Sequence, residues 1–183
     1  MTDCGITDDY LTDLAHFLDE GCPNLKDLHL ARNSIGLEGA MSLASGLVDN
    51  SSLRLLNLSF NRLGSKGVML ICESLRSNRT LQSLFVDANQ VENDGAYALA
   101  DLLLEKQTGL LELHIAWNMI SHNGLVALFH ALSINNRTLK FLDITCNFIE
   151  VSIIHSLRQL IERSPTLKYL NISDLHKFNN LAI

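Results

Sequence analysis

The sequence lacks positive charge at its start: the first 25 residues contain six acidic residues and neither Lys nor Arg. A secretory signal peptide begins with a basic segment and continues with an apolar run, and this segment has neither feature. No later segment approaches the roughly 18 consecutive apolar residues that a membrane-spanning helix needs. We therefore expect a cytoplasmic protein without a membrane partner.

The rest of the chain lacks net charge. All 14 Lys and Arg lie from Lys26 onward, where 14 of the 20 acidic residues also lie. Nucleic-acid-binding domains carry a basic patch or stripe, and a neutral segment does not suggest one. We expect no nucleic-acid partner.

Cysteine is scarce and dispersed. The four cysteines, Cys4, Cys22, Cys72 and Cys146, are far apart and form no CxxC pair. A disulfide framework or a structural zinc site uses more closely grouped cysteines. The spacing therefore favours reduced thiols, and we expect neither a metal ion nor another cofactor.

What the sequence does contain is an internal repeat. The frame LxxLxLxxNx(I/L/V) recurs at intervals of 28 or 29 residues. It starts at residues 25, 53, 81, 110 and 139, as LKDLHLARNSI, LRLLNLSFNRL, LQSLFVDANQV, LLELHIAWNMI and LKFLDITCNFI. A sixth copy, LKYLNISDL from 167, has Leu175 in place of the asparagine. The alternating apolar positions of the frame predict a short strand.

The residues after each frame predict a helix. Their apolar positions are four apart, which places them on one helix face. A recurring glycine, at Gly39, Gly67, Gly95 and Gly124, would let neighbouring helices approach closely. Ile153 takes this place in the fifth unit and predicts a local departure. Asn50, Asn78 and Asn136 fall at the helix ends, where asparagine tolerates the left-handed conformation that stops a helix.

One strand and one helix cannot bury both of their apolar faces alone, so the units must stack. Because a helix is wider than the roughly 4.8 Å spacing of strands, the stack must curve with its strands inside. The sequence therefore predicts a right-handed α/β solenoid, or horseshoe, with parallel strands on the concave face and helices on the convex face. The predicted core positions between the two layers are Leu28, Leu30, Leu56, Leu58, Leu84, Val86, Leu113, Ile115, Leu142 and Ile144.

The frame asparagines predict a structural ladder, formed by Asn33, Asn61, Asn89, Asn118 and Asn147. Their side-chain amides would satisfy backbone groups of adjacent turns. Losing one amide would leave buried polar groups unpaired, at about 1–3 kcal/mol. We expect these residues to be structural and not catalytic.

The frame, the unit length and the helical second half resemble the leucine-rich repeats of the ribonuclease-inhibitor type. The repeat domains of NOD-like receptors and of the Ran GTPase-activating protein look similar, and that of tropomodulin does so more distantly. The stretch from Cys4 to Thr7, followed by Leu11, Leu14 and Leu18, is similar to a variant repeat in which Cys replaces the ladder asparagine.

This resemblance implies a single repeat domain over 1–183. Its expected parts are a partial repeat 1–24, repeats 25–52, 53–80, 81–109, 110–138 and 139–166, and an incomplete repeat 167–183. Neither end supplies the polar capping unit that an exposed solenoid end needs. We expect a piece of a longer array, or ends that another molecule covers.

The side chains between the strand leucines point to the concave surface, because successive strand residues alternate between faces. Five of the chain's eleven aromatic residues fall on that surface. Exposed aromatic residues tend to mark protein interfaces, where Trp and Tyr often carry about 2 kcal/mol or more. The predicted partner-binding residues are Phe60, Phe85, Asp87, Glu112, His114, Trp117, Phe141, Asp143 and Tyr169. For Phe60 and Trp117, packing against the neighbouring loop is an alternative.

The sequence shows no catalytic motif, since phosphate-loop, GxSxG and HExxH patterns are absent. His29 and His114 lie three predicted strands apart, roughly 14 Å, which is too far for one metal ion. We expect a noncatalytic scaffold that binds a protein partner on its concave surface, with no small-molecule substrate. Two alternatives remain open: a GTPase-activating protein of the Ran type, implied by resemblance alone, and a structural component of a cytoskeletal or ciliary assembly.

Overall fold

The computed structural model describes residues 1–19, 22–105 and 108–173. The expectation about Leu175 and the part of the incomplete repeat 167–183 from residue 174 onward lie outside these residues. Within them, short strands alternate with helices along the chain. The strands are β1 Asp27–His29, β2 Leu55–Asn57, β3 Ser83–Phe85, β4 Glu112–His114, β5 Phe141–Asp143 and β6 Tyr169–Asn171. The helices are α1 Leu11–Asp19, α2 Leu37–Leu47, α3 Gly64–Leu75, α4 Glu92–Leu104, α5 His122–Ile134 and α6 Ile154–Arg163, with 3-10 turns η1 Asp8–Tyr10 and η2 Val151–Ile153.

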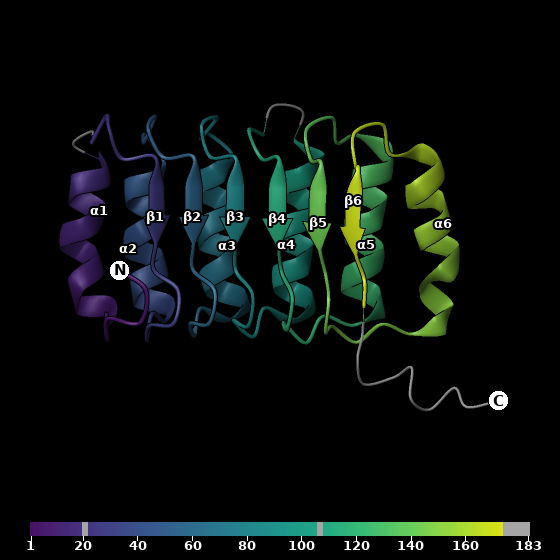
Figure 1. Cartoon of the computed structure of the whole chain (residues 1–183), viewed down its shortest axis with the longest axis horizontal. Helices are drawn as coiled ribbons and strands as arrows, with labels where there is room; N and C mark the ends of the chain where they lie inside the picture. The colour runs from purple at the N-terminus through teal and green to yellow at the C-terminus, as the bar shows by residue number, and fades with distance from the viewer. Residues whose placement is uncertain (20–21, 106–107, 174–183) are drawn as a thin grey trace.

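The strands form one six-stranded parallel sheet in chain order. Each strand pairs with the next at the same frame position, so that Leu28 is opposite Leu56 and Leu56 is opposite Leu84. Figure 1 shows the strands side by side in one layer and the helices in a row behind them. This arrangement confirms the predicted class, an α/β solenoid.

The core lies between the two layers. All ten core positions predicted from the frame are buried, with at most 4% of each residue exposed. The helices contribute residues from the predicted apolar face, such as Leu43 and Leu47 of α2 and Leu128 and Leu132 of α5. A side chain from either layer therefore finds apolar neighbours both in its own repeat and in the adjacent repeats.

The ladder asparagines connect consecutive repeats. The Nδ2 of Asn118 donates to the carbonyl oxygens of Val86, at 2.8 Å, and of Ala116, at 3.1 Å. Its Oδ1 accepts the backbone N–H of Asn89, at 2.8 Å, and of Val91, at 3.3 Å. Asn118 is fully buried, so these bonds supply partners for backbone groups that water does not reach.

The asparagines at the helix ends form a second set of bridges. Asn50, Asn78 and Asn136 are buried, and none of them has a positive φ. The expected left-handed helix stop is therefore wrong. Instead, the Nδ2 of Asn136 donates to the carbonyl of Leu103, at 3.0 Å, and its Oδ1 accepts the N–H of Leu139, at 2.8 Å. A satisfied amide at a buried loop explains these positions without any special backbone conformation.

The recurring glycines permit the close approach of consecutive helices. A Cβ on Gly124 would lie 2.7 Å from Asn93 Oδ1 and 3.0 Å from Ala96 Cβ, both in α4. In the fifth unit Ile153 ends the 3-10 turn η2, and α6 begins one residue later. The local departure predicted for this unit is confirmed.

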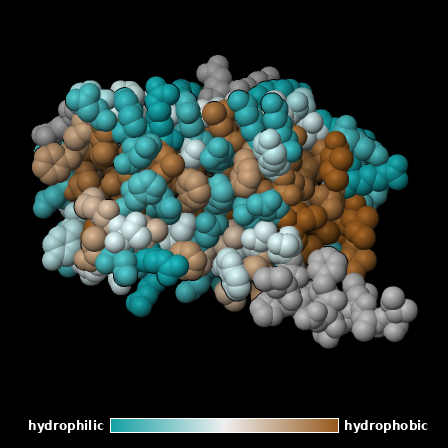
Figure 2. Space-filling model, in the orientation of Figure 1, coloured by the Kyte–Doolittle hydropathy of each residue, from teal (hydrophilic) through white to brown (hydrophobic). Residues whose placement is uncertain are grey.

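Apolar side chains gather at the α6 end of the solenoid, as Figure 2 shows. Ile154 and Ile161 of α6 are 60% and 70% exposed, and Leu160 is the buried residue of that helix. In the part of the chain that the structure describes, no helix is both long and apolar enough to span a membrane.

Candidate binding surface

The strand face is the side of the sheet that turns away from the helices (Figure 1). In each strand the middle residue is more buried than its two neighbours, which point to the strand face. The strand register aligns these neighbours in two columns. The first column is Asp27, Leu55, Ser83, Glu112, Phe141 and Tyr169, and the second is His29, Asn57, Phe85, His114, Asp143 and Asn171.

Four rings on the strand face form a continuous aromatic row, which consists of Phe85, His114, Phe141 and Tyr169. The ring centroids of Phe85 and His114 lie 4.0 Å apart, and the rings are nearly parallel, at 14°. The His114 and Phe141 centroids are 4.7 Å apart at 25°, and those of Phe141 and Tyr169 are 6.3 Å apart at 38°. The row thus crosses β3, β4, β5 and β6, and each ring contact contributes about 0.5–1.5 kcal/mol.

The register explains the course of the row. Phe85 and His114 are direct partners in the second column. Phe141 belongs to the first column, where its direct partner is Glu112, so its ring meets His114 across a diagonal. Long side chains on one sheet face reach diagonal neighbours as well as direct ones. The sequence indicated His114 as a contact residue but not as the ring that joins Phe85 to Phe141.

Asp87 lies at the start of the aromatic row, two residues after Phe85. Its Oδ1 accepts the backbone N–H of Ala116, at 2.7 Å, and its Oδ2 accepts the hydroxyl of Ser59, at 3.0 Å. Burial raises the pKa of Asp87, and these two hydrogen bonds oppose that shift. Burial lowers the pKa of His114, against the attraction of Asp87, Asp143 and Glu112. Near pH 7 the row therefore carries no positive charge of its own.

Asp143 and Glu112 flank the middle of the row. Asp143 accepts the N–H of Thr145 at Oδ1, at 2.9 Å, and the side-chain amide of Asn171 at Oδ2, at 3.1 Å. Glu112 accepts the hydroxyl of Ser83 at Oε2, at 3.1 Å. These bonds orient both carboxylates. In the described ranges, Asp87, Glu112 and Asp143 form no ion pair with Lys or Arg.

Phe60 and Trp117 occupy the eighth frame position, three residues after the ends of β2 and β4. This position has a left-handed backbone in successive repeats, with φ between 51° and 59°, at Arg32, Phe60, Ala88, Trp117 and Cys146. Phe60 is 45% exposed and Trp117 is 52% exposed, so the neighbouring loops do not enclose either ring.

Neither ring belongs to the aromatic row, since no ring contact joins them to it within the described residues. Phe60 instead has the Arg32 guanidinium over its face, with Cζ 4.5 Å from the ring centroid. The structure thus gathers Phe85, His114, Phe141 and Tyr169 and leaves Phe60 apart, while Trp117 stands at the exit of β4.

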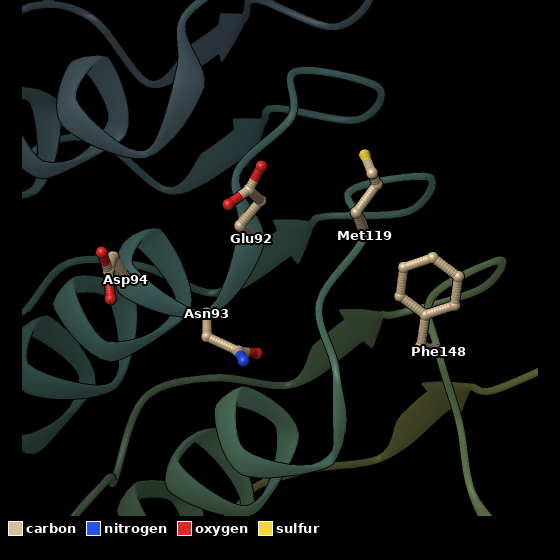
Figure 3. A pocket seen from close by; sticks show the side chains of 5 residues that line it. All are labelled: Glu92, Asn93, Asp94, Met119 and Phe148. Carbon is tan, nitrogen blue, oxygen red and sulfur yellow. The ribbon is translucent and has the colours of Figure 1, made fainter.

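Sequence reasoning missed Met119 and Phe148, which are 51% and 47% exposed. With Glu92, Asn93 and Asp94 they line a hollow of about 300 Å³. In Figure 3 the side chains of Met119 and Phe148 lie side by side, and Asp94 points away from them. Both occupy the tenth frame position, directly after the ladder asparagine. An apolar residue at this position does not contribute to the core, and this is the sequence feature that could have indicated them.

The described part of the chain offers no metal site, because no three His, Cys, Asp or Glu side chains there are placed to hold an ion. What the strand face presents is a row of rings with oriented carboxylates along an open sheet. Such a surface suits recognition of another molecule and does not enclose a reacting group.

Four segments match the leucine-rich-repeat family: residues 21–44, 49–72, 77–100 and 135–152. The chain carries leucine-rich repeats. Among solved structures, leiomodin-1 actin-binding site 2 is similar, with a TM-score of 0.63 and 19% identity over 85% of this chain and 88% of that chain. At this identity the likeness establishes that the repeats share a fold with that protein. No curated protein matches the sequence.

Proposed function

We propose that these leucine-rich repeats form a noncatalytic protein-interaction scaffold whose strand face, the concave surface of the predicted horseshoe, binds the partner. The observation that carries this proposal is the aromatic row, which lies on the sheet face that the helices leave uncovered. Covering these rings would remove apolar area from water at roughly 25 cal/mol per Å². Large aromatic side chains of this kind dominate the energy of protein interfaces.

The proposed contact residues fall in two groups. The aromatic row and its three carboxylates, from Asp87 to Asp143, form the centre of the surface. Trp117 and Phe60 extend it along the strand exits, where both are about half exposed.

The first prediction concerns the triple substitution Phe85→Ala, Trp117→Ala, Tyr169→Ala. We expect the triple variant to lose the partner that the wild-type chain retains in a pull-down, because its interface would lack three large apolar contacts. Each captured protein is identified by mass spectrometry and then titrated in purified form. Circular dichroism should be unchanged, because none of the three residues belongs to the buried core.

The matched control is Tyr97→Ala. Tyr97 is 41% exposed and lies on α4, in the helical layer. This variant should bind like the wild type. Undiminished binding by the triple variant would place the interface elsewhere.

Actin is the first purified protein to test, because the similar leiomodin-1 structure is that of an actin-binding site. The low identity transfers no contact residues to this chain. If the wild-type chain binds actin and the triple variant does not, the cytoskeletal alternative is supported. If actin does not bind, the partner of the scaffold is another protein.

Three finer proposals accompany this function. The repeats belong to the ribonuclease-inhibitor type, supported by their 28 or 29 residue period and by a helix in each unit. The chain forms a single repeat domain, supported by the continuous sheet. It works in the cytoplasm with its cysteines as thiols, which cell fractionation would test.

The Ran-type GTPase-activating alternative is tested by a turnover assay with that GTPase.

A further inference from the structure

We infer that the partner presents a basic segment to the strand face, with an arginine side chain over β4 and β5 between the carboxylates of Glu112 and Asp143. This inference rests on the proposed binding role of the strand face and specifies the chemistry of what binds there.

Four residues of β4 and β5 form a square. In the register, Glu112 is opposite Phe141 and His114 is opposite Asp143. The stacked rings of His114 and Phe141 occupy one diagonal, with centroids 4.7 Å apart. Glu112 and Asp143 occupy the other diagonal, so one carboxylate stands on each side of the rings.

The size of the square suits a guanidinium. Diagonal neighbours on two strands lie roughly 7–8 Å apart. An arginine offers five N–H donors in a planar fork, which can donate to two carboxylates at once while its flat face or its stem contacts a ring. The compact ammonium of a lysine would reach one carboxylate at a time.

Both carboxylates retain acceptor capacity. Ser83 donates to one oxygen of Glu112, and each Asp143 oxygen accepts a single hydrogen bond. A carboxylate has about four acceptor positions, so the existing bonds orient these groups and leave room for a further donor. Glu112 is also exposed, which allows a partner to approach it.

The charge of the surrounding face is uniform. Between β3 and β5, the residues on the strand face include Asp87, Glu112 and Asp143 and no Lys or Arg. Lys140 directly precedes β5 and Lys168 directly precedes β6, one position out of register with the columns. Both lysines are exposed, and among the described residues neither forms an ion pair with Glu112 or Asp143. A basic segment would gain attraction along this face, whereas an acidic or phosphorylated one would be repelled.

The test measures the fluorescence anisotropy of a labelled peptide of alternating arginine and serine upon titration with the purified full chain. Peptides of the same length with glutamate or glutamine in place of arginine serve as controls. We expect only the arginine peptide to bind, with an affinity that falls as salt is added. Equal binding of the arginine and glutamine peptides, or no binding of the arginine peptide, would overturn the inference.

The decisive variant is Glu112→Gln with Asp143→Asn, which removes both charges and preserves side-chain size. We expect its Kd for the arginine peptide to rise about tenfold or more. Asp27→Asn is the matched control, since Asp27 is exposed in the same column but on β1, three strands away from β4. It should bind like the wild type. If the double variant bound the arginine peptide with the affinity of the wild type, the proposed arginine site would be refuted.

The two proposals fail separately. A captured partner that depends on Phe85, Trp117 and Tyr169 but binds the Glu112→Gln, Asp143→Asn variant normally would uphold the scaffold and refute the basic segment. A partner whose binding is unchanged by the aromatic substitutions would refute the proposal that the strand face is the interface.

Discussion

Asn118 and Asn136 are both buried asparagines, yet they serve the fold in different places. Asn118 bonds to backbone groups of the neighbouring repeat beside the strand exits, and Asn136 does so at the end of a helix. Their recurrence in the sequence indicated both positions, but the left-handed backbone expected at Asn136 occurs instead at residues such as Trp117. The recurrence of a residue at the same place in each repeat indicates that it has a structural role. The hydrogen bonds that it forms in the structure show what that role is.

A prediction at this scale concerns His114, whose usual pKa of 6.5 is lowered by burial. Above that value the ring is neutral in both the folded and the unfolded chain. As the pH falls below it, the unfolded chain takes up a proton first, so stability is lost. His114→Phe keeps a ring in the row and removes this proton uptake. We expect its free energy of unfolding, from urea titrations, to fall less than that of the wild type between about pH 7 and about pH 5.

Asp87, whose pKa is raised, also titrates with folding, and the charge of His114 lowers that pKa, so both proteins are compared in an Asp87→Asn background. Asp143 and Glu112 face the ring in both proteins as well. An equal loss of stability in the variant and the wild type would show that His114 does not couple to folding.

At the scale of elements, the spacing of the sequence determines which helix face is buried, and close contacts determine how near two helices come. Gly124 of α5 lies against α4, where an added Cβ would meet Asn93 and Ala96. Where isoleucine replaces the glycine, at Ile153, a 3-10 turn precedes the helix. The glycine pattern was thus visible in the sequence, whereas the form of its exception depended on packing.

The corresponding prediction is that Gly124→Ala destabilises the fold although alanine favours helices. The added methyl group would force α4 and α5 apart, at about 1–3 kcal/mol. The exposed neighbour Asn123, on the same helix, is the control: Asn123→Ala should leave stability unchanged or raise it by a few tenths of a kcal/mol, according to helix propensity alone. Both are measured by chemical unfolding. A stabilised Gly124→Ala variant would show that the helices can separate freely.

At the scale of the whole molecule, each repeat depends on its neighbours, so the position of a residue along the stack affects its energetic role. Asn118 is fully buried between repeats, whereas Asn33, near the start of the stack, is partly exposed and bonds to the backbone of Met1 and Cys4. Water can replace a lost partner near the end of the solenoid but not in its interior.

We therefore expect Asn118→Ala to lower the free energy of unfolding by about 1–3 kcal/mol for each backbone group left unpaired. Asn33→Ala should cost less, because the groups it releases are nearer to solvent. Guanidinium titrations of the two variants compare them directly. Equal losses would mean that burial within the stack does not set the strength of the ladder.

The sequence by itself determined the repeat, the alternation of strand and helix, the core positions and the columns of the strand face, because each follows from a fixed period. It also indicated Phe85, Phe141 and Tyr169 as surface rings. Only the tertiary structure decided that His114 joins them into a row, that Phe60 stands apart under Arg32, and that Glu112 and Asp143 flank the rings. The physical reason is that periodicity sets the face on which a side chain lies, while its partner across the diagonal depends on side-chain length, rotamer and the approach of the next strand.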